Sequence, residues 1–240
     1  ATQWQTFPIE FRGGLISNLT PLQQGSNAVG SATILQNFEV NKEGGYSKVR
    51  GYSKYSTSQL AGSGPLLALK VISSGRIVAA RKNASNLTQY YYSTGNSWSS
   101  IGTSANTGGG KAKSVLYNLD GVDKVVFVDG TNFPAIYSTS GNSLDFFKND
   151  SSGDPFDVGT SDPLGAEHVA IFKNTVFYAK GNTLFFTAPF SVSDFNVANG
   201  AGSINVANNI TGLAVFREQL IIFTTDTIKK LTGSSAADFQ

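Results

Sequence analysis

Residues 124–147 of the chain read KVVFVDGTNFPAIYSTSGNSLDFF. The run 124–128 is almost wholly apolar and β-branched or aromatic, as is usual for a strand that is covered on both faces. A cluster of Asp, Gly, Thr, Asn and Pro follows it and is typical of a turn. Apolar and aromatic residues return at 135–139, and again at 144–147 after a Gly-Asn turn signal. The stretch therefore predicts three consecutive antiparallel strands joined by short turns.

A similar sequence around a Gly-Asn turn occurs earlier in the chain. Residues 90–98 read YYYSTGNSW and residues 136–144 read IYSTSGNSL, so that 46 residues separate Asn96 from Asn142. Asparagine beside glycine tolerates the positive φ of a tight hairpin turn, which is the role expected of both asparagines. The repetition indicates that one hairpin is used twice.

The repeated hairpin belongs to a longer sequence unit that occurs four times. Each unit opens with a short apolar strand, continues with a more strongly apolar second strand, and then adds a third. Aligning Ile77, Val125, Val176 and Leu220 in the second strands gives spacings of 48, 51 and 44 residues. A fourth strand closes the first two units. The expected first strands are 66–71, 114–117, 168–172 and 213–216; the second are 76–80, 124–128, 175–179 and 219–223; the third are 89–93, 135–139, 184–187 and 227–231; the fourth are 98–101 and 144–147.

Short strands in units of about 45 to 50 residues predict an all-β fold, a β-propeller-like array of four-stranded antiparallel blades. An all-β sandwich or an irregular β array is the alternative, since it also has short strands and polar turns at regular spacing. Propellers close with roughly 4 to 8 blades, and the fourth unit reaches Gln240 before its outer strand is complete. Either the N-terminal segment supplies the missing strands or the array is incomplete in this chain.

The first 55 residues differ from the repeats. A candidate strand at 31–40 is separated by the pair Gly44-Gly45 from a second one at 46–52. We therefore expect an N-terminal arm and β-hairpin at 1–55 and a propeller-like domain at 56–240. The expected blade-like units lie at about 65–103, 112–148, 166–198 and 210–240.

Composition narrows the classes of function. Charged residues make up 14% of the chain, against roughly 25% in an average domain. The 18 basic and 16 acidic residues are scattered, so no basic patch indicates nucleic-acid binding. The chain has no cysteine, which excludes disulfides, thiolate zinc sites and cysteine nucleophiles. No run approaches the ~18 apolar residues of a membrane span, so none is predicted.

Residues able to do chemistry form no recognised motif. The single histidine, His168, stands at the start of an apolar strand, and no G-x-S-x-G elbow accompanies it. Asp154, Asp157 and Asp162 offer oxygen ligands for calcium, but they lack the EF-hand order, and two prolines make a rigid loop a sufficient explanation. We expect no catalytic residue, no cofactor and no bound metal.

Two further enzymatic patterns are incomplete. A glycosidase needs two carboxylates at a set separation, and the sequence does not pair its candidates, Asp123, Asp129, Glu167 and Glu218. The run 108–111, Gly-Gly-Gly-Lys, lacks the first glycine and the Ser or Thr of a P-loop. It is expected to be a flexible loop between blades.

Several short segments carry a resemblance to a known group of proteins. They are FRGGL at 11–15, LQNFEV at 35–40, the following GG and GY pairs, and IIFTTDTIKKLTGSSAADFQ at 221–240. With them the chain resembles tailed-bacteriophage virion proteins, especially the tail nozzle or tail-stabilisation proteins of short-tailed phages. The resemblance implies a ring of six identical subunits below the portal and its adaptor ring. Propeller-like domains would surround the channel through which the genome leaves.

The resemblance therefore predicts a non-enzymatic structural protein of the phage tail, a homo-oligomer assembled in the host cytoplasm. It would contact the portal adaptor and other tail proteins or fibres, and DNA would pass it without sequence-specific binding. The arm at 1–30 is expected to dock on a neighbour. Phe7, Ile9 and Phe11 alternate and fall on one strand face, and Leu15 is the fourth apolar anchor.

A function of another class stays open, a phage propeller protein that binds or degrades host-surface carbohydrate. Binding would use exposed aromatic side chains, for which the candidates are Tyr90, Tyr91, Trp98 and Tyr137. The alternative role of these four residues is packing between blades.

Overall fold

The computed structural model describes residues 13–18, 23, 30–41, 45–72, 75–150, 154–160 and 162–240. The chain divides into two compact units, Ala1–Lys54 and Tyr55–Gln240. The division falls one residue before the expected one, between 55 and 56. Among the described residues no helix is long and apolar enough to cross a membrane.

The described part of the first unit contains one short hairpin, in which β1 (Phe38–Val40) pairs antiparallel with β2 (Tyr46–Lys48). The expectation of a strand over the whole of 31–40 was wrong, because only its last three residues join a ladder. Nearer its start, Ala32 forms an isolated parallel bridge with Leu15. Between them, Asn37 has a φ of +62°, outside the extended conformation of a strand, so the ladder begins only at Phe38.

The glycine pair of the FRGGL segment is needed for this bridge. A Cβ at Gly13 would lie 2.7 Å from the Cβ of Ser31, and Gly14 has a φ of +70°. The Tyr46 hydroxyl donates to the carbonyl oxygens of Gly14 and Gly30, each at 3.0 Å. Together these contacts tie the strand pair to the segment around Gly14.

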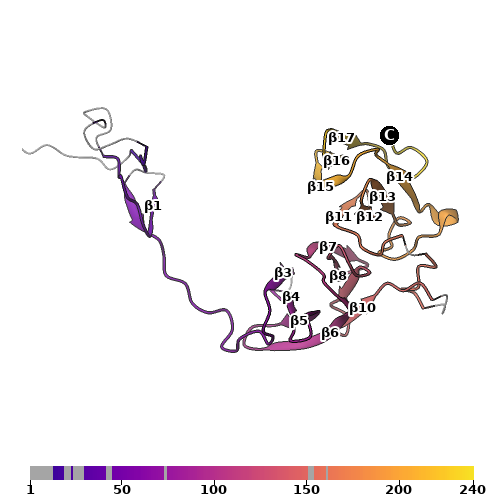
Figure 1. Ribbon diagram of the computed structural model, residues 1–240, viewed down its shortest axis with the longest axis horizontal. Helices are drawn as coiled ribbons and strands as arrows, with labels where there is room; N and C mark the ends of the chain where they lie inside the picture. Colours follow the sequence, from indigo (N-terminus) through magenta and orange to yellow (C-terminus); the bar gives the residue numbers. More distant parts are fainter. Residues whose placement is uncertain are drawn as a thin grey trace, which may run out of the picture. The chain divides into compact units, whose positions relative to one another are not determined.

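The second unit is an array of four antiparallel sheets in sequence order (Figure 1). Among the described residues, each ladder of this array joins strands that follow one another in the chain. The first sheet contains β3 (Leu66–Val71), β4 (Ile77–Lys82), β5 (Leu87–Ser93) and β6 (Trp98–Thr107); the second contains β7 (Lys113–Leu119), β8 (Val122–Val128), β9 (Ala135–Ser138) and β10 (Ser143–Phe146). The third contains β11 (His168–Phe172), β12 (Thr175–Lys180), β13 (Thr183–Phe186) and β14 (Gly202–Asn205); the fourth contains β15 (Ile210–Phe216), β16 (Gln219–Thr224) and β17 (Ile228–Leu231).

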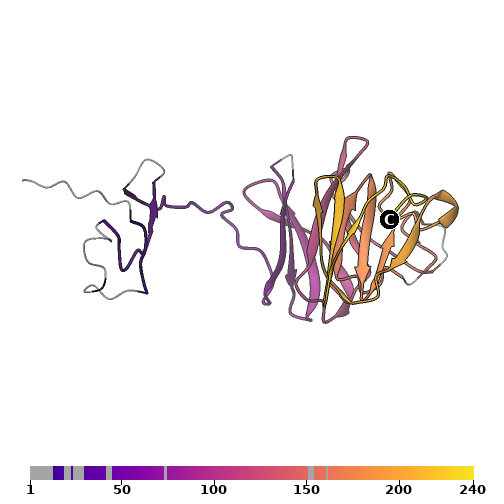
Figure 2. The same cartoon turned by 90° about the horizontal axis from the view of Figure 1, so that it is seen from above.

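These sheets confirm the predicted fold class, an all-β, propeller-like array that is not closed. They stack face to face, as Figure 2 shows from above. The one helical element assigned within the described part of the second unit is a three-residue 3-10 turn, η2 (Val197–Asn199). A sandwich would instead pair strands from different repeats.

Three buried clusters hold the stack together, one between each pair of successive sheets. Within β8, Val125 belongs to the cluster shared with the first sheet, whereas Val126 belongs to the cluster shared with the third. The same alternation places Val176 and Phe177 of β12 in different clusters. Because both faces of β8 and β12 are covered, their sequences are continuously apolar. Of the three clusters formed by described residues, none joins the fourth sheet to the first.

The third sheet has an outer strand that the sequence did not indicate. β14 follows β13 after a loop of fifteen residues and reaches Asn205, beyond the expected limit of 198. Its sequence, GSIN, is nearly free of apolar residues. The glycine is required there, because a Cβ at Gly202 would lie 2.8 Å from the ring of Phe186.

Candidate functional site

The single histidine lies at the start of a strand, next to a lysine. His168 begins β11 and is buried, and the ammonium of Lys113, at the start of β7, lies 2.7 Å from its Nδ1. Burial, together with the positive charge of Lys113, lowers the pKa of the imidazole to about 4. The ring is therefore neutral at pH 7 and accepts a hydrogen bond from the ammonium. Burial also lowers the pKa of Lys113, while Glu167 opposes that shift.

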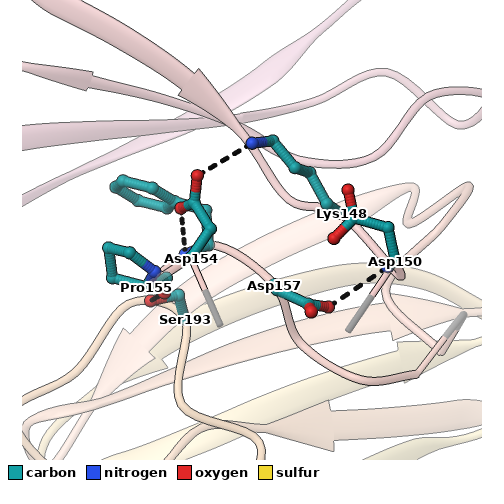
Figure 3. A network of polar contacts seen from close by, with 7 residues as sticks. Lys148, Asp150, Asp154, Pro155, Asp157 and Ser193 are labelled. Carbon is teal, nitrogen blue, oxygen red and sulfur yellow. Dashed lines mark hydrogen bonds and ion pairs between the residues drawn. The ribbon is translucent and has the colours of Figure 1, made fainter. Parts of the chain in front are cut away.

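Asp154 and Asp157 organise the loop that connects β10 to β11 (Figure 3). The Asp154 carboxylate forms an ion pair with Lys148 at 2.8 Å and accepts from the amide of Phe156. Asp157 accepts from the amides of Asp150 and Gly159. The hydrogen bond and the charge of Lys148 lower the pKa of Asp154. Both carboxylates are thus engaged in shaping the loop.

A cleft of about 500 Å³ lies beside this loop. On one side it is lined by Asp154 and Asp157, and on the other by the 191–196 segment that precedes η2. The Ser193 hydroxyl, which donates to the carbonyl of Pro155 at 2.9 Å, joins the two sides (Figure 3). Asp162 is exposed and does not line this cleft. Within the described ranges, no group of three or more His, Cys, Asp or Glu residues could hold a metal ion.

The four carboxylates considered for glycoside hydrolysis occupy four different positions in the array. Asp123 accepts from the Asn118 side chain at 2.7 Å, within the β7–β8 hairpin. The Asp129 carboxylate caps the turn after β8 by accepting from the amides of residues 131 and 132. Glu167 is an exposed residue directly before β11. Glu218, in the β15–β16 turn, forms an ion pair with Lys173.

The Gly-Gly-Gly-Lys run connects the first sheet to the second and is fixed in place at one residue. Gly109 is buried, and a Cβ there would lie 2.2 Å from a carboxylate oxygen of Asp129. The amide of Gly110 donates to the Asp129 carbonyl at 3.1 Å. The run is an inter-blade loop, as expected, but contact with Asp129 restrains it.

Three of the four aromatic candidates for sugar binding are buried. Tyr90 packs against Phe127 with ring centroids 5.4 Å apart, and Tyr137 stacks on Tyr92 at 6.3 Å. Tyr91 is buried on the opposite face of the first sheet, and Trp98 is half-buried. Their use as exposed sugar-stacking residues was therefore wrong for Tyr90, Tyr91 and Tyr137. The stacking of the first and second sheets covers the rings of Tyr90 and Tyr137, and Tyr91 is buried on the other face of the first sheet.

The two Gly-Asn turns, which contain Asn96 and Asn142, have different conformations. Asn142 has a φ of +53°, as expected, and its side-chain oxygen accepts from Arg76 at 2.6 Å and from the Tyr137 hydroxyl at 2.8 Å. Asn96 does not have a positive φ; the positive φ of its turn belongs to Gly95, at +140°. Glycine takes that conformation at lower cost, so the expected role of Asn96 was wrong.

Of the predicted interface anchors, Phe7, Ile9 and Phe11 lie outside the described residues. Leu15 is described, and its side chain is largely exposed while its backbone forms the bridge to Ala32. Docking by these residues stays a prediction.

A groove over the first strands of the sheets was not anticipated. We call β3, β7, β11 and β15 the inner strands; they lie along one edge of the array in Figure 1. Residues of all four line a groove of about 470 Å³, including Lys70, Leu116, Ile171 and Val215. The inner strands contain two lysines, Lys70 and Lys113, and no carboxylate. Their shared position at the start of every repeat was the signal that could have indicated this groove.

No protein-family model and no curated protein matches the sequence. Among solved structures the chain is similar to PorZ, a surface component of the type-IX secretion system of Porphyromonas gingivalis, at 9% identity and a TM-score of 0.41 over 73% of the chain. It is also similar to the extracellular domain of the putative hybrid two-component system BT4673 from B. thetaiotaomicron, at 7% identity and a TM-score of 0.41 over 82% of the chain. A chain of the mitotic checkpoint complex matches at 9% identity and a TM-score of 0.38, covering 85% of this chain and 69% of that one.

The match spans 21% of the PorZ chain and 31% of the BT4673 chain. At these TM-scores and identities the similarities define neither a family nor a function. The propeller-like fold rests on the strand pairing of the chain itself.

Proposed function

We propose that the chain is a structural subunit of a bacteriophage tail, part of a nozzle-like ring that forms the wall of the genome-ejection channel. The sequence resemblance to tail nozzle proteins of short-tailed phages, at FRGGL and in the segment 221–240, motivates this proposal. Six copies would form the ring, in the virion, next to the portal adaptor and other tail proteins or fibres.

The charge of the inner strands is the observation that carries the proposal. A surface past which a phosphate backbone moves should neither repel it with carboxylates nor hold it with many cations, because each phosphate contact adds affinity. The inner strands have no carboxylate and two lysines, and the groove over them is otherwise lined by apolar and hydroxyl residues. Such a surface favours transit over binding.

Images of the assembled protein test the ring. Class averages of the purified chain, or of particles that contain it, should show a ring of six subunits around an open channel. A purified chain that forms no ring at any concentration, with no ring-shaped density of its size in particles, would contradict the proposal. Deletion of residues 1–15 should weaken assembly, and unchanged oligomerisation would refute docking by the arm.

Binding to double-stranded DNA tests the groove. Fluorescence anisotropy should give weak, sequence-independent affinity, in the non-specific range of roughly 10⁻⁴ to 10⁻⁶ M at physiological salt. Replacing Lys70 and Lys113 by Ala should flatten the dependence of log K on log salt by about 0.9 for each phosphate that the protein no longer neutralises. The matched control is Lys124→Ala, on the second strand β8. Tight binding that depends on base sequence would contradict a transit surface.

The cleft beside Asp154 favours a second candidate function, binding of host-surface carbohydrate. Asp154, Asp157 and Asn196 offer acceptors and donors around the half-buried ring of Phe195, the combination of polar groups and an aromatic face that sugars use. A glycan array with the purified protein separates the two functions. Binding that Asp157→Ala removes would support the carbohydrate function, and an array without signal would leave the structural one.

A further inference from the structure

The fourth sheet has one face that no described residue of another sheet covers. The strand registers make the four sheets comparable position by position, since Ile77, Val125, Val176 and Leu220 pair with Val71, Leu116, Ile171 and Val215 of the inner strands. Counting from these pairs identifies the residues that point toward the following sheet. In the first three sheets these residues form the buried clusters.

Three sets of equivalent positions show the difference. At the end of the inner strand, Ile72, Tyr117 and Phe172 are buried, while Phe216 is 60% exposed. In the second strand, Ala80, Val128 and Ala179 are buried, while Phe223 is 37% exposed. In the third strand, Tyr90 and Leu184 are buried, while Ile228 is 70% exposed. The fourth sheet thus keeps the apolar pattern of a blade interface without a blade against it.

These residues form one continuous patch. Phe223 and Ile228 are directly paired across β16 and β17, and the half-buried Ile221 lies on the same face. Two cations border these residues: Lys230, which pairs with Ile221, and Arg217, whose guanidinium lies 5.2 Å from the centroid of the Phe216 ring. We call Phe216, Ile221, Phe223 and Ile228 the terminal face. Contiguous exposed apolar residues of this kind mark interaction sites on proteins in water.

The first sheet presents the complementary half of such an interface. Its face directed away from the second sheet carries Leu69, 54% exposed, and Val71, 59% exposed. The position equivalent to Leu69 in the third sheet is Val169, which is buried between sheets. The segment 55–64 lies over the more distant part of this face, where Arg81 donates to the carbonyl of Gly64 at 2.8 Å. The inner strand β3 is left accessible.

We propose that the terminal face docks on the first sheet of a second copy of this chain, with β15 of one copy beside β3 of the next. Successive inner strands already pack in this manner within the chain, β3 with β7, β7 with β11, and β11 with β15. The contact between copies continues that series. It is head-to-tail, the kind of contact that closes into a ring when the rotation allows. A pair of copies joined in this way continues the row of four sheets into a row of eight.

Engineered thiols test the contact directly, because the chain has no cysteine of its own. Leu69→Cys and Phe216→Cys are prepared separately, mixed and oxidised under mild conditions. A covalent dimer that forms in the mixture, and not with either variant alone, supports the proposal. Phe216→Cys that cross-links to itself shows a face-to-face contact and overturns it. Ser203→Cys on the outer strand β14, mixed with Leu69→Cys, is the control that should give no dimer.

Light scattering gives the second measurement. The unmodified chain should exceed the mass of a monomer in the micromolar range, and Phe223→Lys should be monomeric while its circular dichroism stays unchanged. An unmodified chain that is still monomeric at about 100 μM, where association with a micromolar Kd would be nearly complete, overturns the proposal. The proposal is also overturned if the protein is a monomer and the thiol of Phe216→Cys does not react with maleimide. That result would mean that residues of the same chain cover the terminal face. A ring in micrographs without the Leu69–Phe216 cross-link refutes this contact and leaves the proposed function standing.

Discussion

Replacing Phe177 by alanine tests whether the stacked sheets act as one core. The ring of Phe177 on β12 is fully buried, and its centroid lies 5.6 Å from that of Phe186 and 5.5 Å from that of Phe239. A buried Phe→Ala change costs about 3–5 kcal/mol, and the loss of two aromatic pairs places Phe177 in the upper part of that range. We therefore expect Phe177→Ala to lower the free energy of unfolding by about 4–5 kcal/mol.

For a protein of this size each kcal/mol lowers Tm by about 2–4 °C, so the expected fall is about 8–20 °C. Urea unfolding followed by circular dichroism measures the free energy, and a thermal scan measures Tm. Phe190→Ala is the matched control, because Phe190 is a mostly exposed loop residue of the second unit and the same atoms are removed. Its cost should stay within about 0.5 kcal/mol. A loss at Phe177 no larger than the loss at Phe190 would refute the reasoning that this interface is a packed core.

Three further predictions concern Tyr178, His168 and Asp238. Tyr178→Phe removes the buried hydroxyl that donates to the Val192 carbonyl at 2.8 Å, and urea unfolding should show a loss of about 1–3 kcal/mol; a neutral effect would mean that the carbonyl has another partner. The folded-state pKa of His168 is about 4, below its unfolded value of 6.5, so the free energy of unfolding should fall as pH drops from 6.5 to 4. His168→Gln should remove this dependence on pH. Lys113→Met should raise the pKa of His168 that NMR measures. The carboxylate of Asp238 accepts hydrogen bonds from Ser235 and Ser234, which lower its pKa to about 2. Its contribution to stability is therefore present above pH 3.8 and is lost as the pH falls toward 2. In Asp238→Asn, acid unfolding should depend less on pH between these values.

The strands of the array could be predicted because every repeat uses the same local rule. Sheets that are covered on both faces need apolar residues at successive positions of their second strands, and 124–128 and 175–179 show this directly. Turn residues then fix where each strand ends. In β12 and β16 the expected starts at Thr175 and Gln219 are those of the structure.

What the sequence did not reveal depends on contacts between distant residues. The outer strand β14 is held by pairing with β13 and by the fit of Gly202 against Phe186, neither of which leaves an apolar pattern in its own sequence. The groove over the inner strands likewise exists only once β3, β7, β11 and β15 have been brought together. Aromatic residues were difficult to assign for another reason. A tyrosine suits both a sugar-binding site and the interface between two blades, and only its burial in the structure separates the two roles.

The interface between the first and second sheets shows what fixes the position of one sheet on the next. Apolar burial holds the sheets together but is non-directional, so by itself it permits them to slide. At one end of the interface Arg76, from the β3–β4 turn, donates to Asn142 at 2.6 Å. At the other end the amide of Asn106 donates to the side-chain oxygen of Asn132 at 2.9 Å. Sliding would break both hydrogen bonds and expose apolar surface at once, so the polar ties fix the position that burial stabilises. The channel-wall function proposed above would use this combination of an apolar centre and polar ends.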